Sequence, residues 1–196
     1  MSLPSLPEHT SRQLDLLSSQ LDELKAYLLS PELFWPLGGP IRGTPRLTLG
    51  NLLLNLRTLK SESSTLESAQ QIRLTRLQSV WEAAQTRWES AIAKKALQEM
   101  GARLNLWRGY LDDLSEGLGG RLNYATEVRN RVLFELLIPL AARDEAYDEM
   151  LAAMHSLDQR FAALSTPADF VWNEAYRDAF PKPLFDQLYR RPDLES

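Results

Sequence analysis

The distribution of proline constrains the fold of this chain more than any other feature of its sequence. Prolines occur within residues 4–7, within 31–45 and from Pro167 onward, and Pro139 stands alone between the last two groups. Between Pro45 and Pro139 there is none. Because a proline costs about 3 kcal/mol inside an α-helix, a long proline-free stretch favours long helices. The chain is therefore predicted to be all-α.

Apolar residues that recur at intervals of three and four predict the extent of each helix. A helix is expected over 5–30, followed by a Pro/Gly loop over 31–47 and a short helix over 48–60. A long helix over 64–118 and another over 121–165 are expected to form an antiparallel hairpin around the glycines at 117–120. Pro139 is expected either to kink the second helix or to split it in two, and we favour the kink. A short aromatic helical tail over 167–190 completes an elongated helical bundle, which we predict to be a single domain, 1–196.

A narrow leucine stripe in the first helix indicates contact with another helix. Its members recur at strict intervals of three and four residues: Leu14, Leu17, Leu21, Leu24 and Leu28. This spacing is typical of helices that pack at a shallow angle. Phe34 and Trp35 add large apolar side chains in the loop that follows. We predict that these seven residues form an interaction surface for a protein partner or for a second copy of the chain.

Composition narrows the classes of function. The chain has 196 residues, no cysteine and a formal net charge of −4. Thiolate metal sites and cysteine nucleophiles are excluded, and the acidic balance gives no general attraction to nucleic acid. The first ten residues lack the basic and apolar segments of a signal peptide, and no apolar run has the length of a membrane helix. We expect a cytoplasmic protein with no membrane association and no cofactor.

Two pairs of acidic residues are the feature of the sequence that most suggests a metal-binding or catalytic site. Asp113 and Glu116 lie one helical turn apart, as do Glu145 and Asp148. Carboxylate oxygens suit Mg²⁺, and the spacing resembles the carboxylate pairs of helical nucleotide pyrophosphatases. In a simple hairpin, however, Glu145 would lie about 35 Å beyond the partner of Glu116. A solvated acidic face is the simpler interpretation, and a metal-dependent nucleotide hydrolase is an alternative.

A basic stripe follows one side of the long predicted helix. It comprises Arg73, Arg76, Arg87 and Lys94. Such a stripe suits the backbone of a nucleic acid. Glutamates interleave it, and the four-residue pairs Glu99–Arg103 and Glu127–Arg131 favour a solvated, salt-bridged surface instead.

No set of residues in the sequence points strongly to catalysis. Whether the protein is an enzyme stays open, and we favour a non-catalytic helical scaffold or interaction subunit that acts through helix packing. It would bind a protein partner or self-associate. The first alternative is a helical subunit of a nucleoprotein complex that uses the basic stripe, and the second is the metal-dependent hydrolase.

Overall fold

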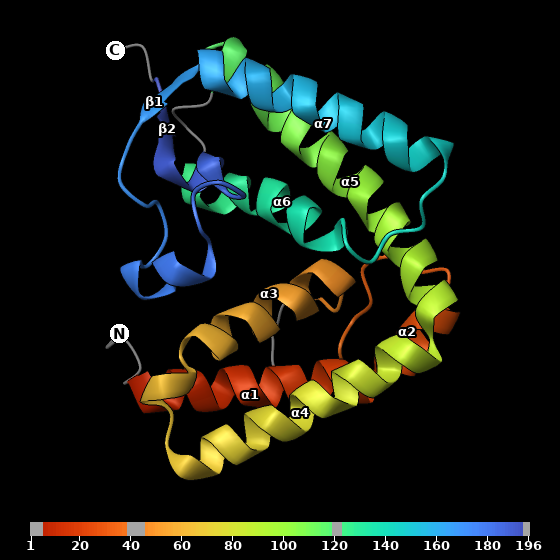
Figure 1. Ribbon diagram of the computed structural model, residues 1–196. Coiled ribbons are helices and arrows are strands. Elements are labelled where there is room, and N and C mark those ends of the chain that lie inside the picture. Colours follow the sequence, from red (N-terminus) through yellow and green to blue (C-terminus); the bar gives the residue numbers. More distant parts are fainter. Residues whose placement is uncertain (1–5, 39–45, 119–122, 194–196) are drawn as a thin grey trace. The chain divides into compact units, whose positions relative to one another are not determined.

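The computed structural model describes residues 6–38, 46–118 and 123–193, and these are mostly helical (Figure 1). The sheet that they contain has two antiparallel strands, β1 (Ser165–Pro167) and β2 (Arg190–Pro192). The all-α prediction is confirmed. In the part of the chain that the structure describes, no helix is both long and apolar enough to cross a membrane. The chain divides into two compact units, Met1–Lys95 and Ala96–Ser196, so the single-domain assignment stays a prediction.

In the first unit, one helix packs against two others (Figure 1). The unit contains α1 (Leu6–Asp22), α2 (Leu24–Leu29), α3 (Leu49–Ser61), the 3₁₀ helix η1 (Ser63–Thr65) and α4 (Ser68–Arg87). Helix α1 contacts both α3 and α4. Glu23 separates α1 from α2, so the single helix expected over 5–30 is two helices. Its expected first residue, Ser5, lies outside the described residues.

Side chains at the N-terminal ends fix where α3 and α4 begin. Thr48 Oγ1 accepts a hydrogen bond from Asn51 N at 3.1 Å, which satisfies one of the free amides of α3. The residue before α4 is Glu67, whose backbone N–H donates to Gln70 Oε1 at 3.1 Å. Helix α4 therefore starts after the expected position at 64, because residues 63–65 turn as a 3₁₀ helix instead.

The long helix expected over 64–118 is interrupted at Trp88. Helix α4 ends at Arg87, and α5 (Glu89–Ser115) follows directly. Trp88 has φ −120° and ψ 26°, which lies outside the helical region. Its amide still donates to Ala84 O at 2.8 Å, and its carbonyl accepts from Ile92 N at 2.9 Å. The prediction of one continuous helix is wrong, because the backbone changes direction at a single residue.

The second unit contains the part of α5 from Ala96 onward, followed by α6 (Tyr124–Leu137) and α7 (Glu145–Ala163). Pro139 thus splits the helix expected over 121–165 in two, so the favoured prediction of a kink is wrong and the alternative is what the structure has. Pro139 has no amide donor, and its ring excludes the carbonyl of Glu135 from helical geometry. Helix α6 therefore ends at Leu137. The long two-helix hairpin is not confirmed, since each of its expected arms is divided.

A new N-terminal cap starts α7 after the proline. Asp144 has an extended backbone, and its Oδ1 accepts a hydrogen bond from Tyr147 N at 3.0 Å. The carboxylate also suits the positive end of the helix dipole. The segment between Pro139 and Asp144 is thus a true interruption rather than a bend in one helix.

The tail after α7 contains strands and 3₁₀ helices instead of the α-helix expected over 167–190, which is a further correction. Pro167 lies in β1, and Thr166 pairs with Arg191 of β2. Between the strands lie η3 (Glu174–Ala179) and η4 (Asp186–Tyr189). Two hydrogen bonds tether the tail to α6: Trp172 Nε1 donates to Ala125 O at 2.8 Å, and Tyr124 Oη donates to Gln187 O.

Candidate functional site

The leucine stripe of the first two helices lies inside the first unit. Leu14 and Leu17 are 1% and 0% exposed, and Leu21, Leu24 and Leu28 are buried as well. Helix α1, which carries most of the stripe, packs against α3 and α4. An apolar stripe covered by neighbouring helices of its own chain offers nothing to a partner. The prediction that these leucines form an interaction surface is therefore wrong, although they do form a packing seam.

Trp35 and its neighbour Phe34 are half-buried in an ordered loop. Trp35 pairs with Leu47 through two backbone hydrogen bonds of 3.1 and 2.9 Å. Its indole Nε1 donates to Glu23 Oε2 at 2.6 Å, and Gly38 N donates to Glu23 Oε1 at 2.8 Å. Trp35 is thus part of the internal framework of the loop, so we no longer assign it to a binding surface.

A buried lysine fastens the start of the same loop to α5. Lys95 is 3% exposed, and its Nζ donates to Ser30 O at 2.9 Å and to Glu32 O at 2.6 Å. The ammonium also lies 4.8 Å from the ring centroid of Tyr27. It occupies the C-terminal end of α2, where backbone carbonyls lack helical partners. Burial lowers the pKa of Lys95, and the Glu32 carboxylate opposes that shift.

The residues of the predicted basic stripe are all exposed, on α4 and on the first turns of α5. These residues are Arg73, Arg76, Arg87 and Lys94. Arg73 Nη1 pairs with Asp15 Oδ1 at 2.8 Å, and the guanidinium of Arg87 lies 5.4 Å from the ring centroid of Trp88. The positive charge of Arg73 is therefore partly offset, whereas Arg76, Arg87 and Lys94 take part in no ion pair with the described residues.

Helix α4 carries a second stripe on its solvent side. Its buried residues are Leu74, Leu77 and Trp81. Elsewhere on its surface, five residues recur at intervals of four, four, three and four: Ile72, Arg76, Val80, Ala83 and Arg87. We call them the outer stripe of α4. All five are exposed, Ile72 by 72% and Val80 by 44%. This stripe combines apolar with cationic side chains and contains no carboxylate.

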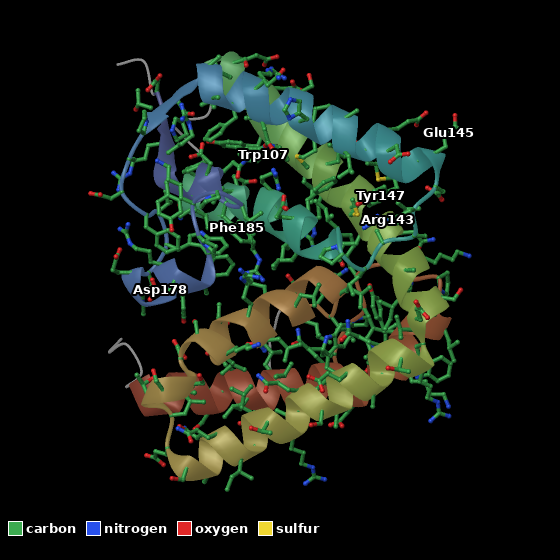
Figure 2. All side chains as sticks on the ribbon, in the orientation of Figure 1. Trp107, Arg143, Glu145, Tyr147, Asp178 and Phe185 are labelled. Atoms are coloured by element: carbon green, nitrogen blue, oxygen red, sulfur yellow. The ribbon has the colours of Figure 1, made fainter. Side chains whose placement is uncertain are left out.

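The acidic pairs proposed as metal ligands do not come together. Arg160 Nη1 pairs with Asp112 Oδ1 at 2.6 Å, which places the end of α5 beside the C-terminal half of α7. Glu145 lies at the other end of α7, about 22 Å from Arg160 along the helix (Figure 2). Asp113, Glu116, Glu145 and Asp148 are all exposed. Among residues 6–38, 46–118 and 123–193, no three His, Asp or Glu side chains are grouped so that they could hold a metal ion.

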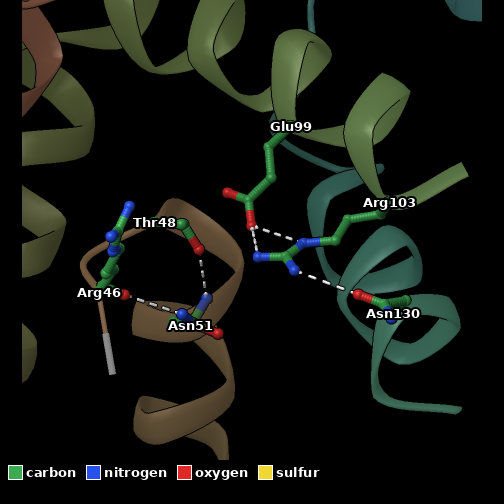
Figure 3. A network of polar contacts seen from close by, with 6 residues as sticks. All are labelled: Arg46, Thr48, Asn51, Glu99, Arg103 and Asn130. Carbon is green, nitrogen blue, oxygen red and sulfur yellow. Dashed lines mark hydrogen bonds and ion pairs between the residues drawn. The ribbon is translucent and has the colours of Figure 1, made fainter. Parts of the chain in front are cut away.

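A buried ion pair within α5 is hydrogen-bonded to α6 in the second unit (Figure 3). Glu99 Oε1 accepts hydrogen bonds from Arg103 Nε at 3.1 Å and from Nη2 at 2.7 Å. Arg103 Nη1 donates to Asn130 Oδ1 of α6 at 3.2 Å. Glu99 is 0% exposed and Arg103 is 7% exposed. The predicted pair of Glu99 with Arg103 is present, but the expectation of a solvated surface is wrong at this position.

A second buried ion pair links α6 to α7. The guanidinium of Arg131 donates to both carboxylate oxygens of Asp158, at 2.9 to 3.1 Å, and to Glu135 Oε2 at 2.9 Å. The sequence predicted Glu127 as the carboxylate partner of Arg131, whereas in the structure Asp158 and Glu135 are its partners. Burial works to lower the pKa of Arg131, but its hydrogen bonds to Asp158 and Glu135 and the charges of these two carboxylates together outweigh burial, and the pKa is raised. A cation held by two carboxylates is a structural crosslink.

An aromatic cluster that includes Trp107, labelled in Figure 2, forms part of the core of the second unit. Trp107 stacks on Tyr110 with a centroid distance of 5.3 Å and meets Phe161 edge-on, also at 5.3 Å. Tyr124 stacks on Phe161 at 5.5 Å. Trp107 Nε1 and Tyr110 Oη are buried and find no hydrogen-bond partner in the part of the chain that the structure describes. Burial raises the pKa of Tyr110 to about 12, and the Glu127 carboxylate adds to the shift.

Comparison of the chain with protein-family models, with curated proteins and with solved structures found no match. Function must therefore be inferred from the geometry of the chain. The outer stripe of α4 is an exposed set that combines apolar groups, charge and helical spacing. Sequence reasoning singled out its arginines but overlooked Ile72 and Val80, although their separation of eight residues places them on one face.

Proposed function

We propose that the protein is a non-catalytic helical interaction subunit that binds another protein chain through helix packing. The exposure and spacing of the outer stripe of α4 are the observations that support this proposal. Isolated exposed apolar residues are normal on protein surfaces. Here Ile72, Val80 and Ala83 are exposed along one line of a 20-residue helix that buries few side chains. A line of apolar groups at this spacing is what a second helix packs against.

The length of the outer stripe also suits a helix partner. From Ile72 to Arg87 it extends over about 22 Å, or four helical turns. The long side chains of Arg76 and Arg87 add apolar stems to the surface while their charged ends stay in water. The buried ion pairs and the aromatic cluster of the second unit join helices of this chain to one another, so they do not compete as binding surfaces.

Site-specific photo-crosslinking in the cells that make the protein tests the proposal. A photoreactive residue at position 80 is expected to give a covalent adduct with a protein. The same residue at position 184, where the natural leucine is 54% exposed in the second unit, is the matched control. An adduct of twice the 22.3 kDa chain mass would identify a second copy as the bound protein. No adduct at position 80, or equal adducts at both positions, would overturn the proposal.

A helical subunit of a nucleoprotein complex is the second candidate function. Its support is the exposure of Arg76 and Arg87 on α4 and of Lys94 on the first turns of α5. Binding of this kind weakens steeply as salt is added, because each phosphate contact releases a counterion. A flat titration with duplex DNA or RNA at low salt would eliminate it.

A further inference from the structure

We infer that the partner of the outer stripe presents an acidic amphipathic helix, with an apolar line flanked by carboxylates. This inference rests on the proposed function and specifies the chemistry of the partner at the same surface. Three properties of the stripe support the inference: its positive charge, the apolar groups between its arginines, and the spacing of those arginines.

The charge of the outer stripe is entirely positive. Arg76 and Arg87 belong to it, and Lys94 lies seven residues beyond Arg87, on the first turns of α5. All three side chains are exposed. Within the described part of the chain, Arg76 and Lys94 take part in no ion pair, whereas Arg73 beside the stripe is paired with Asp15. A partner with carboxylates would meet cations that are already in water and unpaired.

A second copy of the chain is a poor occupant of this stripe. Two outer stripes brought face to face would gather four arginines and no carboxylate of either stripe. Like charges placed together at an interface oppose association. The same physics favours a partner of opposite sign, in which each guanidinium exchanges water for a carboxylate.

The apolar groups of the stripe favour a protein helix over a nucleic acid. Val80 and Ala83 lie between the two arginines, and Ile72 lies one turn before Arg76. A sugar–phosphate backbone supplies charge at every position but no apolar line. An amphipathic helix supplies both, since its apolar face meets the apolar line and its flanking acids reach the arginines.

The spacing of the cations sets the spacing of the acids. Arg76 and Arg87 are eleven residues apart, which corresponds to about 16 Å along the helix axis. Carboxylates eleven residues apart on a partner helix that runs alongside α4 would therefore meet both arginines. The apolar residues between those carboxylates would then cover Val80 and Ala83.

Fluorescence anisotropy with the full chain and three labelled probes tests the inference. The first probe is a helical peptide of about 21 residues, with a leucine stripe at three–four spacing and flanking glutamates eleven residues apart. The second is a scrambled peptide of identical composition, which forms no stripe. The third is a DNA duplex of about 20 base pairs. We expect the first peptide to bind about tenfold or more tightly than either other probe.

Paired variants locate the binding site. Ile72→Ser with Val80→Ser removes the apolar line, and Arg76→Gln with Arg87→Gln removes the charge. Each pair is expected to weaken binding of the first peptide by about tenfold or more. The matched controls, Leu184→Ser and Arg143→Gln, change exposed residues of the second unit and should leave the affinity within about twofold. Thermal melting of every variant confirms that the fold is retained, because all of these residues are exposed.

Several results would overturn the inference. These are tighter binding of the duplex, equal binding of the two peptides, no binding of the first peptide, or unchanged affinity of the arginine variant. The proposed function has a separate test. A crosslink from position 80 to a protein whose contacting segment is not acidic would refute the inference and retain the interaction subunit. Absence of any crosslink would refute both.

Discussion

Tyr110 and Tyr124 lie in one aromatic cluster but differ in what their hydroxyl groups contact. Tyr124 Oη donates to Gln187 O, whereas Tyr110 Oη is buried and finds no partner among the described residues. Replacement by phenylalanine removes one oxygen and leaves the ring contacts of either residue in place. Tyr124→Phe therefore deletes a hydrogen bond, and Tyr110→Phe deletes a desolvated hydroxyl group.

The two substitutions are expected to change stability in opposite directions. Loss of the Tyr124 hydrogen bond should lower the free energy of unfolding by about 1 kcal/mol, and by up to roughly 3 kcal/mol if the Gln187 carbonyl stays unpaired. Tyr110→Phe removes an unpaired buried group, so it should leave the free energy of unfolding unchanged or raise it by about 1 kcal/mol. For a chain of this length, 1 kcal/mol corresponds to about 2–4 °C in Tm.

Urea denaturation measures both effects. Unfolding is followed by tryptophan fluorescence, to which Trp107 of the cluster and the four other tryptophans contribute, and by circular dichroism, which reports on the helices. Coincident transitions justify a two-state free energy for each variant. If Tyr110→Phe costs as much as Tyr124→Phe, the reasoning is refuted, because the Tyr110 hydroxyl would then have a hydrogen-bond partner in solution.

Four further predictions use similar measurements. Lys95→Met should lower the free energy of unfolding by about 1–3 kcal/mol, because the partly buried carbonyls of Ser30 and Glu32 lose their donor. Lys94→Met, at an exposed position, should change it by less than about 0.5 kcal/mol. Asp158→Asn leaves the buried Arg131 with one carboxylate and should cost about 3 kcal/mol in the same urea assay, whereas a negligible loss would contradict the buried pairing. Between about pH 10 and 12 the unfolded chain releases the Tyr110 proton while the folded chain keeps it, so the free energy of unfolding should fall as the pH rises over this range. Alkaline denaturation of Tyr110→Phe should show a smaller fall. Millimolar Mg²⁺ should leave Tm unchanged, and a rise of several degrees would revive the acidic pairs as a metal site.

Helices whose ends carry a local signal could be predicted from the sequence. The short helix expected over 48–60 corresponds to α3 (Leu49–Ser61), which begins after the capping residue Thr48. The start of α7 carried a comparable signal, since Asp144 is a favoured capping residue followed by an acidic first turn. The continuous apolar pattern across this region outweighed that signal and led to the prediction of a single kinked helix.

Interruptions that depend on tertiary packing could not be predicted. Trp88 is neither glycine nor proline, yet the helix breaks there. Gly101 is a poor helix former, yet it lies inside α5. A Cβ at this glycine would lie 3.4 Å from Met150 Cε, so the Met150 side chain of α7 packs over this point of α5. Local propensity says nothing about either effect.

The same limit applies to the buried charges. Lys95, Glu99 and Arg103 follow one another along α5 and look like an ordinary charged surface in the sequence. Their burial depends on acceptors from distant segments, such as Ser30 O for Lys95 and Asn130 Oδ1 for Arg103. The spacing of the outer stripe, by contrast, is local. It was available in the sequence, but only the structure distinguishes the side of α4 that stays exposed.

The tethered tail of the second unit bears on how the chain folds while it is being made. The ribosome produces α5, α6 and α7 before residues 165–193, at about 5–20 residues per second. For a few seconds the hydroxyl of Tyr124 and the carbonyl of Ala125 therefore lack their hydrogen-bond partners, Gln187 and Trp172. Chaperones that recognise exposed aromatic rings can bind the chain during this interval. A chain cut short by a premature stop codon within the tail would lack these partners permanently, which would leave it exposed to quality-control proteases.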